Sequence, residues 1–169
     1  MANKCQVFCL LLLSSLPMLS KAEDVSVEAL KAGIEGVYVL QEWHRNGQVM
    51  RPPLVDARLV FLNGHTVFIS YDGSQETKKT FVGYGIYVLE AGKFSYRYER
   101  VNVVSKTASE ASVSEKLPWE GLRLFAASID GNGIYFRAID GPQESWFNSE
   151  GLTYSDGTQK RVYRRITEK

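Results

Sequence analysis

Residues 81–98 read FVGYGIYVLEAGKFSYRY, and this stretch decides the fold. Aromatic and β-branched residues dominate both sides of Ala91-Gly92, which is typical of two β-strands joined by a tight turn. In the second of these strands, Phe94, Tyr96 and Tyr98 share one face, while serine, arginine and glutamate occupy the other. The polar face belongs to solvent, so we expect the three aromatic side chains to point inward.

Strand patterns and turn signals recur along the rest of the chain. Asn63-Gly64 is the strongest turn signal, because both central residues of a two-residue hairpin turn adopt positive φ. Apolar residues at helical spacing in 25–34, with Ser26 as N-cap and Gly36 as a stop, predict one short helix ahead of the strands. The expected strands cover residues 36–44, 57–62, 66–71, 81–90, 93–104, 122–129, 134–140 and 160–167.

These strands are joined by short local connections and do not alternate with helices, so the sequence predicts an all-β, antiparallel protein. An up-and-down barrel of about eight strands, with a short N-terminal helix, removes the sheet edges and leaves room for one small ligand. A two-sheet sandwich is the competing arrangement. The polar stretch 105–116 is expected to be an exposed loop, with a lid at the barrel mouth as the alternative.

Residues 1–22 have the pattern of a secretory signal peptide. A positively charged start is followed by the apolar run 5–16 and by Ser20-Lys21-Ala22, which has small residues where signal peptidase cleaves. Cleavage leaves 23–169 as a single β-barrel domain, secreted or periplasmic, with no stable membrane insertion expected. Both cysteines lie in the cleaved segment, and the chain has no Asn-x-Ser/Thr acceptor, which favours a bacterial periplasm.

Three segments resemble bacterial lipocalin-like domains, which are calycin-type small β-barrels. Residues 36–43 (GVYVLQEW) resemble the first strand of that family, 79–87 (KTFVGYGIY) its strand rich in tyrosine and glycine, and 161–166 (RVYRRI) its closing strand. Tyr38 is a departure, because the family usually has tryptophan there. The resemblance spans about residues 34–167 and implies a barrel that binds a small hydrophobic or amphipathic ligand.

The first and last of these segments also predict how one end of the barrel closes. Gly36 permits a tight turn into the barrel, and the ring of Tyr38 then covers the floor. An arginine of the last strand can lie on that ring and bond to carbonyl groups at the floor. Arg164 and Arg165 are the candidates, and they point to opposite faces of the strand. We interpret Gly36, Tyr38 and one of these arginines as structural residues.

Inward tyrosines are the strongest indication of a binding site, because a buried hydroxyl needs a hydrogen-bond partner, which a ligand or water can supply. Hydroxyls that merely reach the barrel rim are the alternative interpretation. Arg97, Arg123 and Arg137 lie in expected strands. An inward arginine would bind a carboxylate head group, but we expect all three to point outward. The predicted ligand-binding residues are Phe94, Tyr96, Tyr98, Tyr87, Phe68 and Trp43.

Few residues indicate catalysis, and no catalytic residue is predicted. His44 and Glu42 share one face at a strand end, where a solvated pair is expected rather than an acid–base pair. His65 follows a turn and is expected to be exposed. No cluster has metal-ligand spacing and no loop has a complete dinucleotide motif, so no metal or cofactor is expected. A formal net charge of +1 without a basic stripe argues against nucleic acid as a partner.

The sequence thus predicts an exported barrel that binds a small hydrophobic or amphipathic molecule in an aromatic-lined cavity. A small-barrel enzyme of the isomerase or cyclase type is one alternative, and it requires a polar group deep inside. An interaction protein with a filled core is another, and it requires the aromatic side chains to leave no cavity. The ligand, the open end of the barrel and the oligomeric state are left undetermined at this stage.

Overall fold

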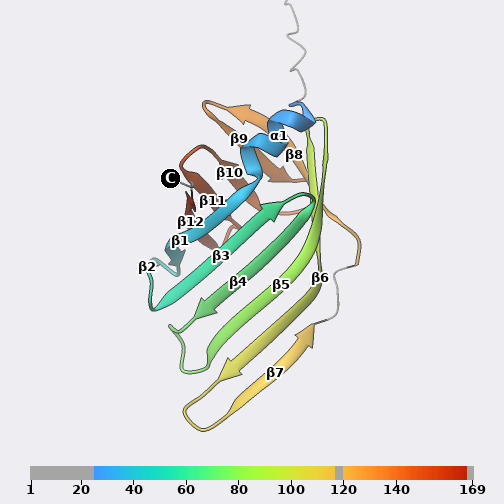
Figure 1. Cartoon of the computed structure of the whole chain (residues 1–169). Coiled ribbons are helices and arrows are strands. Elements are labelled where there is room, and N and C mark those ends of the chain that lie inside the picture. The colour runs from blue at the N-terminus through green and yellow to red at the C-terminus, as the bar shows by residue number, and fades with distance from the viewer. Residues whose placement is uncertain (1–24, 117–119, 167–169) are drawn as a thin grey trace, which may run out of the picture.

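The structure is a computed structural model that describes residues 25–116 and 120–166 (Figure 1). The signal peptide expected at 1–22 lies outside the described residues. Within the described ranges there are one helix and twelve strands. These elements are α1 (Val27–Ile34), β1 (Gly36–Arg45), β2 (Gln48–Met50), β3 (Val55–Leu62), β4 (His65–Asp72), β5 (Lys78–Glu90), β6 (Lys93–Lys106), β7 (Ala111–Lys116), β8 (Arg123–Asp130), β9 (Gly133–Ala138), β10 (Glu144–Phe147), β11 (Gly151–Ser155) and β12 (Gln159–Ile166).

Ten of the described strands form one closed antiparallel barrel. Each pairs with the barrel strand that follows it in the chain, from β1 and β3 through to β12, and β12 pairs back with β1. The remaining two described strands lie outside the ring, where β2 pairs with β1 and β7 with β6. The prediction of an all-β up-and-down barrel with a short N-terminal helix is confirmed, with ten strands in place of about eight.

Two barrel strands, β10 and β11, are absent from the expected set. β10 has four residues and β11 has five, so neither is long enough to show a clear alternation of side chains. Turn residues such as Gly141-Pro142 also interrupt this part of the sequence. Their place in the barrel comes from pairing with β9 and β12. The boundaries of the other eight barrel strands differ from the expected ones by at most three residues.

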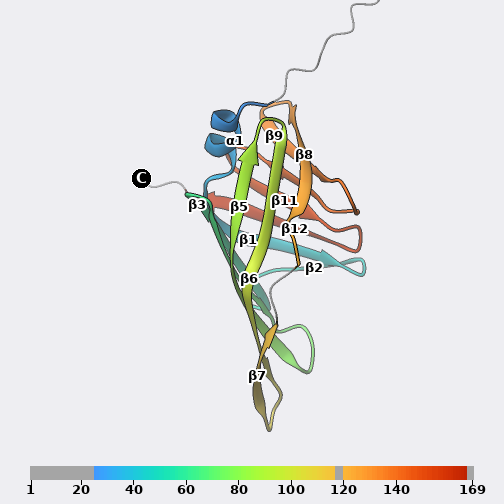
Figure 2. The same cartoon turned by 90° about the vertical axis from the view of Figure 1, so that its right-hand side faces the viewer.

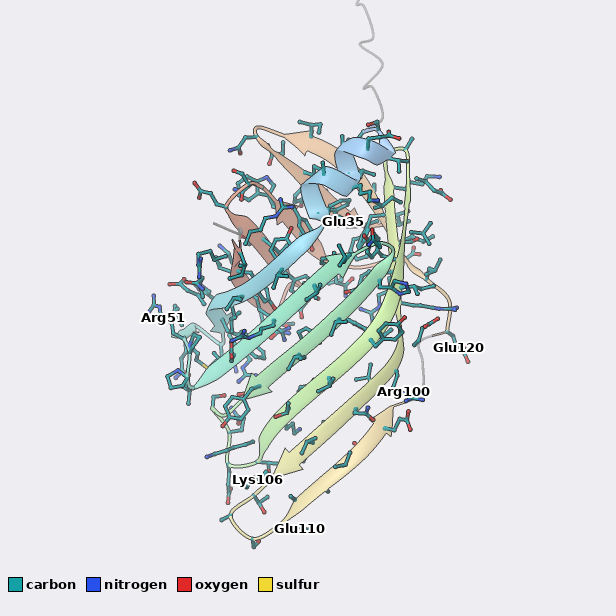
Figure 3. All side chains as sticks on the ribbon, viewed as in Figure 1. Glu35, Arg51, Arg100, Lys106, Glu110 and Glu120 are labelled. Atoms are coloured by element: carbon teal, nitrogen blue, oxygen red, sulfur yellow. The ribbon has the colours of Figure 1, made fainter. Side chains whose placement is uncertain are left out.

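The stretch 105–116 is not the loop that its composition predicts. β6 continues to Lys106, and the chain returns beside it as β7 after a turn in which Thr107 N donates to Glu110 O at 2.9 Å. The sequence is polar here because this hairpin projects beyond the barrel wall and is exposed (Figures 1 and 2). Arg100, Lys106 and Glu110, labelled in Figure 3, lie along the projection.

The short helix α1 closes one end of the barrel and is visible at the top of Figure 1. Ser26 caps the helix, because its side-chain oxygen accepts a hydrogen bond from the backbone N–H of Ala29. Leu30 and Ile34 lie on one face of the helix, are completely buried and join the aromatic core. The helix contacts β5 and β9. It therefore forms the floor of the barrel.

Arg165 fastens this helix to the last strand. Its guanidinium donates hydrogen bonds to the backbone carbonyls of Ala32 at 3.3 Å and Gly33 at 3.4 Å, and also to that of Glu35. Carbonyls at a helix C-terminus lack partners within the helix and carry partial negative charge, so a cation there is stabilising. The guanidinium carbon of Arg165 also lies 5.9 Å from the centre of the Tyr38 ring.

The other expected floor residues surround Arg165, with one exception. The Tyr38 hydroxyl donates to the carbonyl of Ile34 at 2.9 Å. Burial raises the pKa of Tyr38 to about 12, although the charge of Arg165 acts to lower it. A β-carbon at Gly36 would lie 2.8 Å from Arg165 Nε, so glycine leaves the room that the guanidinium needs. Arg164 is the exception, because it is exposed to solvent.

We expect Arg165→Ala to lower the free energy of unfolding by about 1.5–3 kcal/mol, because carbonyls at the helix end lose charge-assisted hydrogen bonds. Arg164→Ala removes the same side chain from an exposed position and should change that free energy by less than about 0.5 kcal/mol. Urea unfolding followed by circular dichroism measures both variants. Equal losses in the two variants would contradict the role assigned to Arg165.

Candidate functional site

The barrel contains a partly open cavity of about 240 Å³, with walls from β3, β4, β6, β8, β10, β11 and β12. Most of the lining side chains are aromatic. At its inner end, Phe61 and Phe147 contact the floor residue Tyr38 edge-to-face, with ring centres 6.4 and 5.6 Å from that of Tyr38. Phe94 and Phe125, whose ring centres are 5.7 Å apart, form an adjacent wall. The cavity therefore begins where the closed aromatic floor ends.

Four of the six side chains expected to bind ligand line this cavity: Phe68, Phe94, Tyr96 and Tyr98. Three of them come from β6, where alternation along the strand turns them to the same side. Tyr87 lies instead at the floor, where its hydroxyl donates to Glu35 Oε1 at 2.6 Å. Glu35 is labelled in Figure 3 where α1 leads into β1. Tyr87 is thus placed to hold the floor and does not line the cavity.

Arg123 lines the cavity, so the expectation that it points outward is wrong. In the β6–β8 ladder it lies directly opposite Tyr96, and residues opposite each other share one face of a sheet. The adjacent Leu124 is exposed on the other face, so hydrophobicity alone assigns the wrong side of β8 to the interior. Arg97 and Arg137 do lie on the outer face, where each pairs with a glutamate.

Strand β12 supplies three inward side chains that span the barrel from end to end. Alternation places Arg161, Tyr163 and Arg165 on one face, with Arg165 at the floor and Arg161 towards the opposite end. Arg161 and Tyr163 are not among the predicted site residues, because the inward face of β12 is ambiguous until Arg165 is placed. It also missed Tyr154, a further cavity residue, because β11 was not among the expected strands.

Trp43 and Gln159 hold Arg161 at the outer end of the cavity. The guanidinium carbon of Arg161 lies 4.0 Å from the centre of the Trp43 ring, which is a cation–π contact. Trp43 Nε1 donates to Gln159 Oε1 at 2.6 Å. Gln159 Nε2 in turn donates to Asp156 Oδ2 at 2.7 Å. Asp156 thus orients the Gln159 amide, which in turn orients the Trp43 indole. The indole then supports the guanidinium of Arg161.

A second, more polar cavity of about 570 Å³ adjoins the first at this end. Its walls include an ion pair in which Arg45 donates to Asp72 Oδ2 at 2.8 Å. Trp43, the remaining residue expected to bind ligand, lies in the wall of this outer cavity. Arg161 and Gln159 line both cavities. They therefore mark the boundary between the aromatic inner space and the polar outer space.

The cavity tyrosines are neutral at neutral pH, and burial raises their pKa values further. It raises the pKa of Tyr98 well above the ordinary value, and the nearby phenols of Tyr96 and Tyr163 raise it further. Burial likewise raises the pKa of Tyr163 and of Tyr154, against the opposing charge of Arg161. At neutral pH the side chains around Arg161 are therefore phenols that can donate hydrogen bonds, not phenolates.

The pair that could have done acid–base chemistry lies outside the barrel. His44 Nε2 is 2.9 Å from Glu42 Oε2 on the outer face of β1, and Arg51 bonds to the same carboxylate. In the described ranges 25–116 and 120–166, no three or more His, Cys, Asp or Glu side chains gather as a metal site would require. No helix in the described part of the chain has the length and hydropathy needed to span a membrane.

Fold and site together define a class of protein: a closed antiparallel β-barrel with an aromatic internal cavity that borders polar space at one end. Comparison of the chain with protein-family models, with curated proteins and with solved structures finds no match. The function is therefore inferred from the geometry of the cavity.

Two carboxylates near the outer cavity make the stability of the barrel sensitive to acid. Burial acts to raise the pKa of Asp72 and Asp156, but hydrogen bonds from neighbouring side chains outweigh it and lower both below the ordinary value of 3.8. At pH values near the ordinary pKa of aspartate, the unfolded chain therefore binds more protons than the native state. The stability that these groups contribute is complete above about pH 5 and is lost as the pH falls through their native pKa values.

We expect Asp156→Asn to lower the free energy of unfolding by about 1 kcal/mol at neutral pH, because the turn loses charge-assisted hydrogen bonds. Between about pH 6 and pH 3, the variant should lose less stability than the wild-type chain, because one linked carboxylate is gone. Chemical unfolding at a series of pH values measures both effects. Asp140→Asn, at an exposed position, is the control, and an identical pH dependence in Asp156→Asn and wild type would refute the linkage.

Proposed function

We propose that the protein is an exported, lipocalin-like carrier that binds a small amphipathic molecule inside its barrel. The observation that carries this proposal is the aromatic cavity of about 240 Å³, with α1 at the floor and Arg161 at the other end. Aromatic walls accept the apolar body of a ligand, and a few polar groups at one end orient it. Each Å² of apolar surface removed from water contributes about 25 cal/mol to such binding.

The cavity volume favours a compact ligand. Pockets for drug-sized molecules commonly measure about 300–1,000 Å³. The inner cavity lies just below this range, which suits a body of one or two rings. A longer molecule would have to extend past Arg161 into the outer cavity, whose walls are more polar.

The alternatives are less well supported by the geometry. A filled core requires the aromatic side chains to pack without free space, whereas these side chains surround a cavity. A small-barrel enzyme requires a polar group deep inside, and Arg123 and Arg161 line the cavity. General acid–base catalysis further requires a group that exchanges protons near neutral pH. The polar side chains that line the inner cavity, among the described residues, are arginine, tyrosine, serine and glutamine, and burial raises the pKa of its tyrosines further from neutrality.

Export of the carrier is supported by the sequence of residues 1–22, with its apolar run and small residues before the cleavage position. The three segments that resemble lipocalin-like domains support the carrier part of the proposal, since they supply β1, β5 and β12 of the barrel. We place the mature protein in the periplasm or outside the cell.

Native mass spectrometry of the protein exported from cells tests the proposal directly. We expect an excess mass that disappears on extraction with organic solvent, and analysis of the extract identifies the cargo. The extracted protein should then bind the neutral apolar dye N-phenyl-1-naphthylamine, with a saturable increase in dye fluorescence. A clean apo mass together with no dye binding would overturn the carrier assignment in favour of the filled-core protein.

A cavity-filling variant locates the binding. Ser145 lines the cavity, so Ser145→Phe should weaken dye binding by at least about ten-fold while the barrel stays folded. Ser128→Phe adds the same ring at an exposed position of β8 and should leave dye binding unchanged. Far-UV circular dichroism confirms that both variants are folded. Equal binding by both variants would show that the dye does not enter the barrel.

A further inference from the structure

We infer that the polar group of the bound molecule is an oxyanion, such as a carboxylate, and that Arg161 binds it where the aromatic cavity meets the outer one. This inference rests on the proposed function, because it names the chemical class of the ligand of the same cavity.

The charge of the cavity wall is the first support. Arg123 and Arg161 both line the inner cavity, whereas no aspartate or glutamate of the described chain does so. Arg123 is exposed to solvent, whereas part of the Arg161 guanidinium is buried. Removing a guanidinium from bulk water is costly unless an opposite charge or hydrogen-bond acceptors replace the water. The wall supplies neutral acceptors, such as Gln159 Oε1, but no opposite charge, which a negatively charged ligand would bring.

The hydrogen bonding of Arg161 is the second support. Its Nε is buried and has no hydrogen-bond acceptor in the described structure. Its Nη2 donates to Gln159 Oε1 at 3.4 Å, which is long for a hydrogen bond of a charged donor. No carboxylate within residues 25–116 and 120–166 forms an ion pair with Arg161. Arg161 therefore has neutral hydrogen-bond partners, and its charge is not balanced by a carboxylate at the cavity boundary.

The neighbouring Arg45 shows the contrast within the same site. Its guanidinium carbon lies 5.1 Å from the centre of the Trp43 ring, so Trp43 contacts two arginines. Arg45 is neutralised by Asp72, with 2.8 Å between Nη1 and Oδ2. Arg161 instead has the indole, a polarised but uncharged partner. Of the two cations on this ring, Arg161 is the one whose charge a ligand would balance.

The tyrosines around Arg161 complete an oxyanion-binding arrangement. In the β11–β12 ladder Tyr154 lies directly opposite Arg161, and Tyr163 follows Arg161 on the same face of β12. Tyr98 lines the same cavity from β6. Buried phenols stay protonated, so each can donate one hydrogen bond as well as accept one, whereas a guanidinium has donors only. A carboxylate accepts several hydrogen bonds through its two oxygens, whereas an amide offers one acceptor oxygen and adds two donors of its own. The donor-rich boundary therefore selects a carboxylate over an isosteric amide.

Binding of 2-naphthoate and 2-naphthamide tests this inference, because the two molecules share one ring system and differ mainly in charge and donors. Isothermal titration calorimetry near neutral pH measures both affinities. It uses the secreted protein after its cargo has been removed by organic extraction. We expect 2-naphthoate to bind at least about ten-fold more tightly than 2-naphthamide. Equal affinities, or tighter binding of the amide, would overturn the oxyanion assignment.

Variants of β12 locate the selectivity. Arg161→Met keeps the length and apolar stem of the side chain but removes its charge, so it should weaken 2-naphthoate binding by at least about ten-fold and change 2-naphthamide binding by less than about three-fold. Arg161→Lys keeps the charge without the planar fork and should restore part of the loss. Arg164→Met, an exposed position on the same strand, is the matched control and should leave both affinities unchanged.

The possible failures are distinguishable. If Arg161→Met weakens both naphthyl probes equally, Arg161 acts only as cavity wall and the oxyanion assignment is wrong. If N-phenyl-1-naphthylamine binds but 2-naphthoate does not, the assignment is again wrong, while the carrier function stands. If the wild-type protein binds none of the three probes and carries no extractable cargo, both proposals fall together.

Discussion

Pairing between β1 and β12 closes the barrel, and both the floor and the cavity depend on it. The ladder joins the two ends of the described chain, from Val37–Ile166 to Arg45–Gln159. Because successive side chains of a strand point to opposite faces, its register decides which side chains enter the barrel. In the observed register Arg161 and Arg165 point inward. A slip of one residue would instead turn Arg164 inward and leave the helix without its anchor.

The two inward arginines of β12, Arg165 and Arg161, have different partners at the two ends of the barrel. Arg165 meets carbonyl groups that the end of α1 leaves without partners, so the chain itself satisfies this guanidinium. Arg161 rests on the Trp43 ring and faces the boundary of an aromatic cavity and a polar one. The first arginine closes the floor, and the second gives the other end its positive charge.

Local patterns predicted most of this architecture where a strand is long enough to show its alternation. The aromatic face of β6 is the clearest case, since Phe94, Tyr96 and Tyr98 all line the cavity. The prediction missed β10 and β11, which are too short to alternate visibly, and β7, whose exposure gives it the composition of a loop. It also misjudged Arg123, because exposed leucines flank it and the face of β8 is decided by its partner strand.

The sequence by itself determined the all-β class, the antiparallel hairpins and the capped helix, because these follow from turn chemistry, capping and the period of neighbouring residues. The tertiary structure decided that the barrel has ten strands, that α1 closes one end, and that Arg165 rather than Arg164 anchors it. It also decided that Trp43 meets Gln159, 116 positions away, and thereby holds Arg161. Such contacts depend on the register in which β1 and β12 pair, and no local pattern along the chain encodes that register.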